Sequence, residues 1–394
     1  MHAVVHELAV HRLNIPLRTR VTHAAAQRSV ADPVIVRVEF RHGALGFGEA
    51  VPRSYVTGET VNTVVAAIED TFLPYLVSFH AESLPDALEA IDALPWQDPK
   101  GHLVPAARAA VELALLDASL KTFDRRVEHV VQWMGLPRFG NPGSLRTVRF
   151  SAIFAGESSQ NFRRRLRKYV WAGLRDFKLK VGLAEDCEHL EILRRSLGRS
   201  LDSGRRTLRI DTNGTWTKDD AIKWFKGVPP VRIAAVEQPL AKGDEEWVVV
   251  HEAVGLPIIH DESLVTLADA RGLIDRDARQ IFNIRMSKCG GLLPSLRIAE
   301  LARRSGTRVV LGCMVGETSV LAAAGRRFLE VCPDVQWAEG CFGDRLLQRD
   351  VTRKSLKFGY GGRVPRIPER GLGVSVLESR LQEFADEPPK VFRL

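Results

Sequence analysis

Acidic and basic side chains end a series of short apolar runs in the middle of this 394-residue chain. Lys178 and Lys180 lie in the first run, and Asp211, Glu237 and Asp261 end the next three. Three carboxylates with no cysteine or histidine at matching positions suit a hard divalent cation, Mg²⁺ or alternatively Mn²⁺. Such a cation would hold a substrate carboxylate and stabilise the charge that appears when a proton leaves the neighbouring carbon.

The lysines are the candidate bases for that proton. Lys178 and Lys180 lie on the same side of one strand, because side chains alternate along a strand with a period of two. Their mutual repulsion and the nearby cation are expected to lower the pKa of one of them, as a neutral base requires. Lys288 follows the run 282–287 and is expected three strands further round the rim. Two opposed bases suit removal of a proton on one face and its return on the other.

The spacing of these residues predicts the elements that position them. Successive intervals along the series from Lys178 to Lys288 are 33, 26, 24 and 27 residues. One strand and its returning helix take roughly 30 residues, and the carboxyl ends of parallel strands meet at one rim. Further strands are expected at 149–154, 308–311 and 335–338, which makes eight. The sequence therefore predicts a (β/α) barrel over residues 133–370, with the candidate residues around its mouth.

The preceding residues, 1–132, have a different pattern. A strand is expected within the first 20 residues, a β-hairpin at 34–40 and 45–49, and helices at 60–76 and 105–121. This is an α+β unit, to which the tail, residues 371–394, is expected to return.

Charge and composition exclude several classes of function. The formal net charge is +8 and the pI is about 9.4. The densest basic cluster, 163–168, is interpreted as a solvated helix face rather than an anion-binding patch, and no aromatic residues interleave with it as in a nucleic-acid groove. No apolar stretch is long enough to cross a membrane. Five cysteines without paired spacing, and a start that lacks the pattern of a signal peptide, indicate a cytoplasmic protein.

Five short motifs carry a family resemblance. The chain has KLK at 178–180, DTN at 211–213, VEQP at 236–239, DES at 261–263 and NIRMSKCGG at 283–291. Together they resemble the enolase superfamily, specifically its muconate-lactonizing-enzyme subgroup, over nearly the whole chain. The resemblance implies a TIM-type (β/α) barrel, modified as in that superfamily, under an N-terminal α+β capping domain of residues 1–132 completed by 371–394.

The resemblance also implies roles for individual residues. One Mg²⁺ would be held by Asp211, Glu237 and Asp261. Lys180 and Lys288 would be the acid/base pair, and Lys178 would tune Lys180. Asn213 and Glu262 would lie next to the metal ligands and hold them in position without binding the metal.

Several reactions share this core. An epimerase of a dipeptide or amino-acid derivative is favoured narrowly, because two bases permit inversion and Glu339 could hold an ammonium group. A muconate-type cycloisomerase and a dehydratase of the o-succinylbenzoate-synthase kind are the alternatives. The mandelate-racemase mechanism is excluded, since it needs a histidine near the seventh strand and the last histidine is His260. A non-catalytic anion-binding protein is disfavoured because all six candidate residues are present.

Substrate choice is expected to depend on two loops of the first unit, 21–28 and 52–58, and on residues after the last two barrel strands. Arg28 and Arg53 could bind a second anionic group of a small carboxylate substrate, although surface salt bridges explain them equally well. Tyr55 lies in the second loop. Glu317, after the seventh strand, is a further candidate without an assigned role. A homo-oligomer without nucleic-acid or membrane partners is expected.

Overall fold

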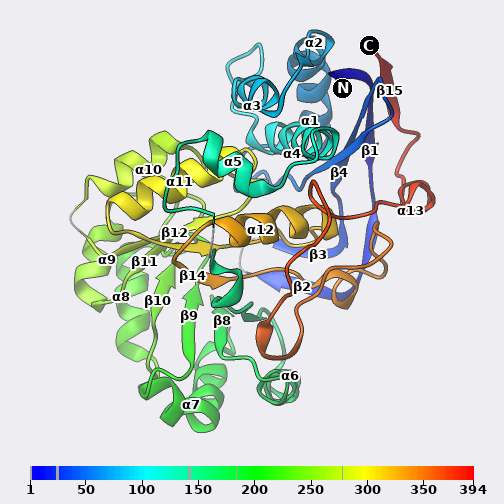
Figure 1. The fold of residues 1–394 in the computed structure, drawn as a ribbon. Helices are drawn as coiled ribbons and strands as arrows, with labels where there is room; N and C mark the ends of the chain where they lie inside the picture. Colours follow the sequence, from blue (N-terminus) through cyan, green and yellow to red (C-terminus); the bar gives the residue numbers. More distant parts are fainter. Residues whose placement is uncertain (1, 24–25, 141–142, 183, 277) are drawn as a thin grey trace.

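The computed structural model describes residues 2–23, 26–140, 143–182, 184–276 and 278–394. It contains a mainly antiparallel sheet near both chain ends and a curled parallel sheet, with helix α4 (Pro105–Thr122) among the helices near the first sheet (Figure 1). Residues Ala24 and Ala25 of the first expected substrate loop lie outside the described part.

The first sheet has the strand order β15 (Lys390–Arg393), β1 (Ala3–Arg12), β4 (Val34–Phe40) and β5 (Leu45–Ala50), and β6 (His80–Ala81) also pairs with β1. Because β15 pairs with β1, the two ends of the chain lie side by side (Figure 1). The expected hairpin is present as β4 and β5. The single strand expected near the start is in fact two: β1, and β2 (Ile15–His23), which pairs with β3 (Ala26–Ala31).

The helix expected at 60–76 is interrupted. It forms as α1 (Val61–Ala67), a wider π-helical turn, η1 (Ile68–Phe72), and α2 (Leu73–Val77), followed along the chain by α3 (Leu84–Asp92). Pro74 explains the interruption, because proline has no N–H to donate and its ring clashes with the carbonyl four residues earlier. A wider turn before the proline relieves that clash.

The second sheet has eight parallel strands in chain order. Their bounds are β7 (Ala152–Phe154), β8 (Asp176–Lys180), β9 (Thr207–Asp211), β10 (Ala235–Glu237), β11 (Ile258–His260), β12 (Gln280–Ile284), β13 (Arg308–Leu311) and β14 (Val335–Ala338). A parallel bridge between Phe150 and Ala338 joins the first strand region to the last. The predicted barrel with eight strands is therefore confirmed.

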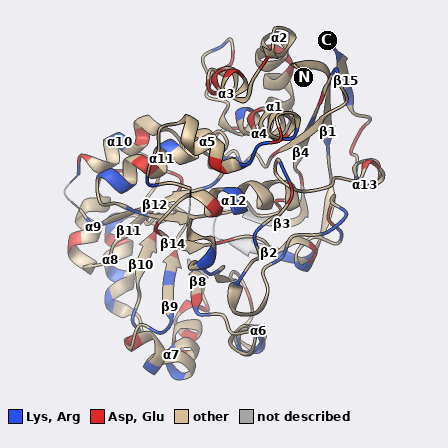
Figure 2. Ribbon diagram, viewed as in Figure 1, with Lys and Arg blue, Asp and Glu red and all other residues tan. Residues whose placement is uncertain are grey.

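Helices alternate with these strands along the chain (Figure 1). They are α6 (Ser159–Trp171), α7 (Asp186–Asp202), α8 (Lys218–Gly227), α9 (Trp247–Val254), α10 (Leu267–Ile274), α11 (Leu292–Arg304) and α12 (Ser319–Val331), with α5 (Val127–Trp133) before the barrel and α13 (Glu378–Glu383) after it. Acidic and basic residues are distributed over these helices (Figure 2). Within the described ranges, no helix has the length and apolar character needed to traverse a lipid bilayer.

Two glycines join the barrel to helix α4 of the first unit. Gly291 has a φ of +117°, and a Cβ added there would lie 2.5 Å from the carboxyl group of Glu112 on α4. The Gly290 carbonyl accepts a hydrogen bond of 2.6 Å from Arg108, also on α4. The close approach therefore requires glycine, and it fixes the end of the loop that carries Lys288.

Substituting Gly291 with alanine is expected to destabilise the fold by about 2–4 kcal/mol, since backbone strain and a steric clash add. Urea unfolding measures the loss. Gly198→Ala is the matched control: Gly198 lies inside α7 with nothing near its Cβ position, so stability should rise by about 0.5–1 kcal/mol. Equal effects of the two substitutions would contradict the argument.

Glu112 also makes stability depend on pH. Burial raises the pKa of Glu112 to about 7, and one of its carboxyl oxygens, Oε2, has no hydrogen-bond partner. Because the pKa of Glu112 is higher in the folded than in the unfolded state, its protonated form contributes to the free energy of unfolding. That contribution is complete below pH 4.5 and is lost as pH rises through 7. Between pH 6 and pH 8, the free energy of unfolding of the wild type should fall by about 1 kcal/mol more than that of Glu112→Gln. Urea unfolding at both pH values tests this, and parallel curves for the two proteins would refute it.

Candidate active site

Three buried carboxylates stand at the ends of neighbouring strands. Asp211 ends β9, Glu237 ends β10 and Asp261 follows β11, and none of the three is exposed to solvent. Register places Glu237 beside Asp211, because the two are directly paired across β9 and β10. The sequence-based expectation that these side chains share one rim agrees with this arrangement.

Lys178 and Lys180 lie next to these carboxylates, on β8. The Nζ atoms of both are 3.0 Å from Asp211 Oδ2. Lys178 also donates to Glu237 Oε1 at 2.6 Å, whereas Lys180 donates to Asn213 Oδ1 at 2.7 Å. Lys178 is buried, and Lys180 is partly open to the mouth. Lys180 is therefore the better placed of the two to reach a substrate.

The electrostatic expectation for this lysine pair is not met at Lys178. Burial alone would lower the pKa of Lys178, but attraction to Asp211, Glu237 and Glu339 outweighs burial and holds its pKa well above the usual value. The same lysines reverse the effect of burial on Asp211, whose pKa is held below its usual range. The expectation considered the repulsion between the two lysines and the nearby cation, and it did not consider the three carboxylates around Lys178.

Lys288 lies on the opposite side of the barrel. Lys180 ends β8 and Lys288 follows β12, so β9, β10 and β11 lie between them and β12 is the fourth strand round from β8 in a barrel of eight. Lys288 Nζ is 3.0 Å from Asp261 Oδ1 and also donates to the Asp261 and Asn283 carbonyls at 2.5 and 2.9 Å. Four strands is half the circumference, which places the two lysines across the mouth from each other.

Sequence reasoning assigned no role to two residues of this network, Arg285 and Asn283. Arg285 forms an ion pair with Asp261, and its pKa is held well above the usual value because that attraction and others outweigh burial. Asn283 donates from Nδ2 to Glu237 Oε1 at 2.9 Å. Both belong to the NIRMSKCGG motif. Each is a polar residue within an apolar run, and this pattern could have identified them as candidates for the site.

Glu339 is held inside the barrel. Its Oε1 accepts a 2.7 Å hydrogen bond from Arg209, and its Oε2 accepts one of 3.1 Å from Lys178. Arg209 is fully buried, donates to Ser151 at 2.7 Å and lies 4.9 Å over the Trp337 ring. Both carboxylate oxygens are thus engaged by cations of the protein, an arrangement that does not favour the expected contact with a substrate ammonium group. Arg209 could have been suspected as a charged residue in the apolar run before Asp211.

The residues expected from the first unit lie apart from this network. Arg28 pairs with Asp32 at 3.1 Å, as in the salt-bridge alternative. Arg53 is buried, pairs with the same aspartate at 2.9 Å and donates to the Val315 carbonyl at 2.7 Å, so it anchors the loop after β13. Tyr55 is 39% exposed.

Glu317 lies under the rim, in the loop after β13. Its Oε2 accepts a hydrogen bond of 3.2 Å from the Met314 N–H. Burial raises the pKa of Glu317 to about 8. At neutral pH this side chain is therefore largely uncharged.

The donor set fits a hard divalent cation. Glu237 Oε2 and Glu262 Oε2 are buried without a hydrogen-bond partner, whereas Asp211 Oδ2 lies 3.0 Å from the Nζ atoms of Lys178 and Lys180. Asn213 donates weakly to Glu262 Oε1, at 3.4 Å. Buried oxygens without donors need a cation to offset their desolvation, and oxygen-only sets favour Mg²⁺ or Mn²⁺. In this arrangement Lys178 and Arg285 lie between the three carboxylates, so a bound ion would compete with the protein's own cations.

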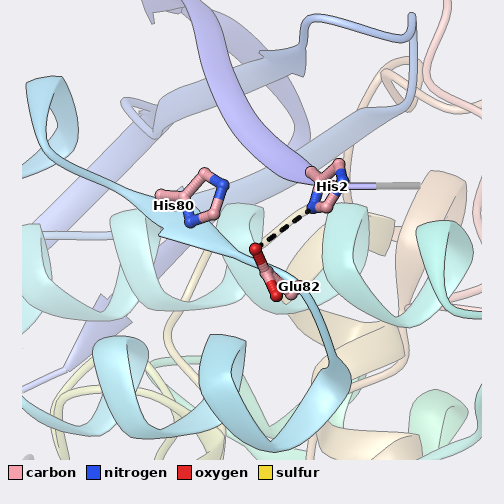
Figure 3. A group of neighbouring side chains, drawn as sticks. All are labelled: His2, His80 and Glu82. Carbon is pink, nitrogen blue, oxygen red and sulfur yellow. Dashed lines mark ion pairs between the residues drawn. The ribbon is translucent and has the colours of Figure 1, made fainter.

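A second group of possible ligands lies on the first sheet. Figure 3 shows His2, His80 and Glu82, whose ligand atoms lie within 4.8 Å of one another. No other trio in the described ranges is so close, the barrel carboxylates included. All three side chains are exposed, and the closest ion pair, His2 to Glu82, is 3.8 Å. An exposed group of this kind carries no metal argument alone, whereas the three barrel carboxylates are buried and Glu237 Oε2 among them has no partner.

Family models and relatives agree with this fold. The model of the enolase C-terminal domain-like family matches residues 161–380, and that of the mandelate racemase / muconate lactonizing enzyme N-terminal domain matches 5–131. The protein is thus an isomerase of the enolase superfamily. Within it, the chain belongs to the mandelate racemase / muconate lactonizing enzyme family, as the sequence motifs predicted.

Three relatives show the range of this family. An L-Lys-D/L-Arg epimerase of Methylococcus capsulatus is 31% identical, over 93% of this chain and 98% of its own. Muconate cycloisomerase 1 of Pseudomonas putida is 26% identical, over 97% and 96%. The structure of a dipeptide epimerase from Enterococcus faecalis V583, complexed with Mg and the dipeptide L-Leu-L-Tyr, has a TM-score of 0.79 at 23% identity, over 94% and 99%.

Proposed function

We propose that this isomerase is Mg²⁺-dependent, removes the proton α to a substrate carboxylate through an enediolate, and epimerises an amino-acid derivative or dipeptide. The observation that carries the proposal is the placement of Lys180 and Lys288 on opposite sides of a mouth lined by three buried carboxylates. Mn²⁺ is the alternative cation. The capping role of residues 1–132 with 371–394 over a barrel of 133–370 belongs to the same proposal, and the pairing of β15 with β1 supports it.

Each candidate residue of the site would have a separate role in the reaction. Asp211, Glu237 and Asp261 would hold the cation, which when bound supplies positive charge to the substrate carboxylate as the α-proton leaves. Lys180, oriented by Asn213, would take the proton on one face of the substrate. Lys288, held by three oxygen acceptors, would return it on the other. Lys178 would stay protonated, so it would act on Lys180 as a fixed charge.

The muconate-type cycloisomerase remains the second candidate. The observation that favours it is Glu339: with both oxygens engaged, it does not supply the free carboxylate that an ammonium-bearing dipeptide would need. The o-succinylbenzoate-synthase-like dehydratase uses the same lysines and has no observation of its own.

Deuterium uptake from D₂O in the presence of Mg²⁺ tests the proposal. Pools of dipeptides, N-acyl amino acids and muconates would be incubated with the enzyme and followed by mass spectrometry and chiral chromatography. Uptake with inversion supports epimerisation, whereas lactone formation from muconates supports the second candidate. No uptake in any pool, together with no metal binding, would overturn the assignment.

Mg²⁺ itself is expected to stabilise the protein. A ligand at a concentration one hundred times its dissociation constant adds about 2.7 kcal/mol to the free energy of unfolding. Asp211→Asn and Glu237→Gln should each remove this metal-dependent rise in Tm, because each deletes a charged ligand. Asp219→Asn, at an exposed position on α8, is the control and should keep it. A rise that persists in both ligand variants would place the ion elsewhere.

We also propose a homo-oligomer. Trp171 and Tyr360 are 86% and 77% exposed. The segments that carry them are in contact, since Gly361 N–H donates to the Ala172 carbonyl at 2.7 Å. An exposed aromatic patch of this kind is typical of an interface. Light scattering of wild type and a Trp171→Ser/Tyr360→Ser variant tests it, and a monomeric wild type would refute it.

A further inference from the structure

A large cavity adjoins the candidate catalytic rim. Its volume is about 910 Å³, and its walls come from β2, the loop after β7, helix α6 and the loops after β13 and β14. Ile153, on its wall, is the register partner of Lys178, and Gly340, also on its wall, follows Glu339. The cavity therefore begins beside the network that holds the candidate bases and extends outward along α6.

The wall of this cavity has two chemically different parts. An apolar part is formed by side chains of the β13 and β14 loops and the segment beyond them, Met314, Val315, Phe342, Leu346 and Phe358. A basic part is formed by Arg20, Arg164, Arg165, Lys168 and Arg345. Such a surface suits an apolar chain that ends in an anion.

Most of this positive charge has no acidic partner. Among the lining residues that the structure describes, the carboxylates are those of Glu157 and Glu317. Glu157 is paired with Arg165, and Glu317, which is partly exposed, accepts a hydrogen bond of 3.2 Å from the Met314 N–H. Among the described residues, the remaining four cations form no salt bridge; Arg345 lies 4.6 Å over the Phe358 ring. A cationic ligand would therefore meet four positive charges without a salt bridge here, against a single carboxylate without one, Glu317.

Three cations of the basic part lie on one face of helix α6. Asn161, Arg164, Arg165 and Lys168 have helical spacing that puts them on one face, and all four line the cavity. Arg167, on the same helix, does not line it. The cluster that the sequence analysis interpreted as a solvated helix face thus includes one wall of a cavity next to the active site.

We propose that the substrate carries a second anionic group, a carboxylate at the end of its acyl or side chain, which Arg164 and Lys168 bind in this cavity. This inference rests on the proposed function for the reacting end of the molecule and adds the chemistry of the distal end. It also separates this chain from the 31%-identical relative, which is an L-Lys-D/L-Arg epimerase and whose name indicates cationic side chains.

Matched substrates that differ only in distal charge test the proposal. One series is N-succinyl-, N-succinamoyl- and N-(4-aminobutanoyl)-L-leucine, and the other is L-Ala-L-Glu, L-Ala-L-Gln and L-Ala-L-Lys. Deuterium exchange at the α-carbon would be measured with Mg²⁺. In at least one series the anionic member should have a kcat/KM at least 10-fold above its neutral partner, and the cationic member should be the poorest.

Variants assign the effect to α6. The double variant Arg164→Gln/Lys168→Gln should lower kcat/KM for the anionic substrate 10- to 100-fold, mainly through KM, and should change that for the neutral one by less than 3-fold. Arg167→Gln is the matched control and should leave both unchanged. Preference for neutral or cationic members, or equal losses for anionic and neutral ones, would overturn the proposal while exchange itself still supported the reaction.

Binding separates a failure of this inference from a failure of the proposed function. Calorimetric titration with glutarate and N-succinyl-L-leucine needs no turnover. Binding that the double variant loses and Arg167→Gln keeps supports the anion site even if no exchange is found, in which case only the proposed reaction fails. If no anion binds and nothing exchanges, both are overturned.

Discussion

Replacing Lys288 by alanine is expected to abolish epimerisation but to leave one half of the proton exchange. Lys180 stays on its own face of the mouth, so the enantiomer whose α-proton points toward Lys180 should still exchange with deuterium. The other enantiomer should lose exchange by about 10²–10⁴-fold, the usual contribution of a general acid or base. Lys180→Ala should show the opposite pattern. The prediction is specific because β12 is the fourth strand round from β8, half of the eight-stranded barrel, which places the two lysines on opposite sides.

Chiral chromatography with mass spectrometry on each pure enantiomer gives the measurement. Lys223→Ala, at an exposed position on α8, is the control for loss of a lysine and should behave like wild type. A Tm for each variant checks folding, because Lys288 also binds three oxygen atoms. Loss of both enantiomers' exchange in a correctly folded Lys288→Ala variant would show that the two lysines do not act as independent bases.

The carboxylates at the strand ends could be predicted from the sequence because the pattern that identifies each one, an apolar run followed by an acidic residue, is local. Asp211, Glu237 and Asp261 each follow a buried run, and a regular interval is enough to place them on one rim. The same series places three strand ends, those of Asp211, Glu237 and Asp261, between Lys180 and Lys288, as the structure does. The π-helical turn before Pro74 is also local, but sequence periodicity does not distinguish it from a continuous helix.

What could not be predicted depends on segments far apart in the chain. Arg164 and Lys168 have the same helical pattern whether water or a cavity faces them. The cavity exists only because residues near 20, 315 and 342 fold over that helix. Glu339 is a similar case, because a carboxylate at a strand end does not reveal that Arg209, 130 positions earlier, occupies it. The raised pKa of Lys178 is a similar case, since its acidic neighbours Asp211, Glu237 and Glu339 come from three different strand ends.

Replacing Glu339 by alanine is expected to destabilise the barrel strongly. Arg209 would keep only Ser151 and the face of Trp337, and its charge would be buried without a carboxylate. Removing one partner of a buried ion pair costs about 3–5 kcal/mol. Lys178 would lose less, because Asp211 and Glu237 remain within 3.0 Å. The prediction concerns stability rather than substrate binding, which distinguishes it from the role that the sequence suggested for Glu339.

A double-mutant cycle in urea separates the two roles. Glu339→Leu and Arg209→Leu should each be strongly destabilising, whereas the double variant should be less destabilised than the sum, because no buried charge is left unpaired at that position. Glu339→Gln, which keeps an acceptor for Arg209, should lie between wild type and the alanine variant. If Glu339→Ala unfolds like wild type and loses only the binding of ammonium-bearing substrates, Glu339 is a substrate ligand and the narrow preference for a dipeptide is restored. If Glu339→Leu is instead destabilising and its effect is not additive with that of Arg209→Leu, Glu339 belongs to the barrel interior. There it fixes the position of Lys178 behind Lys180, the proposed base.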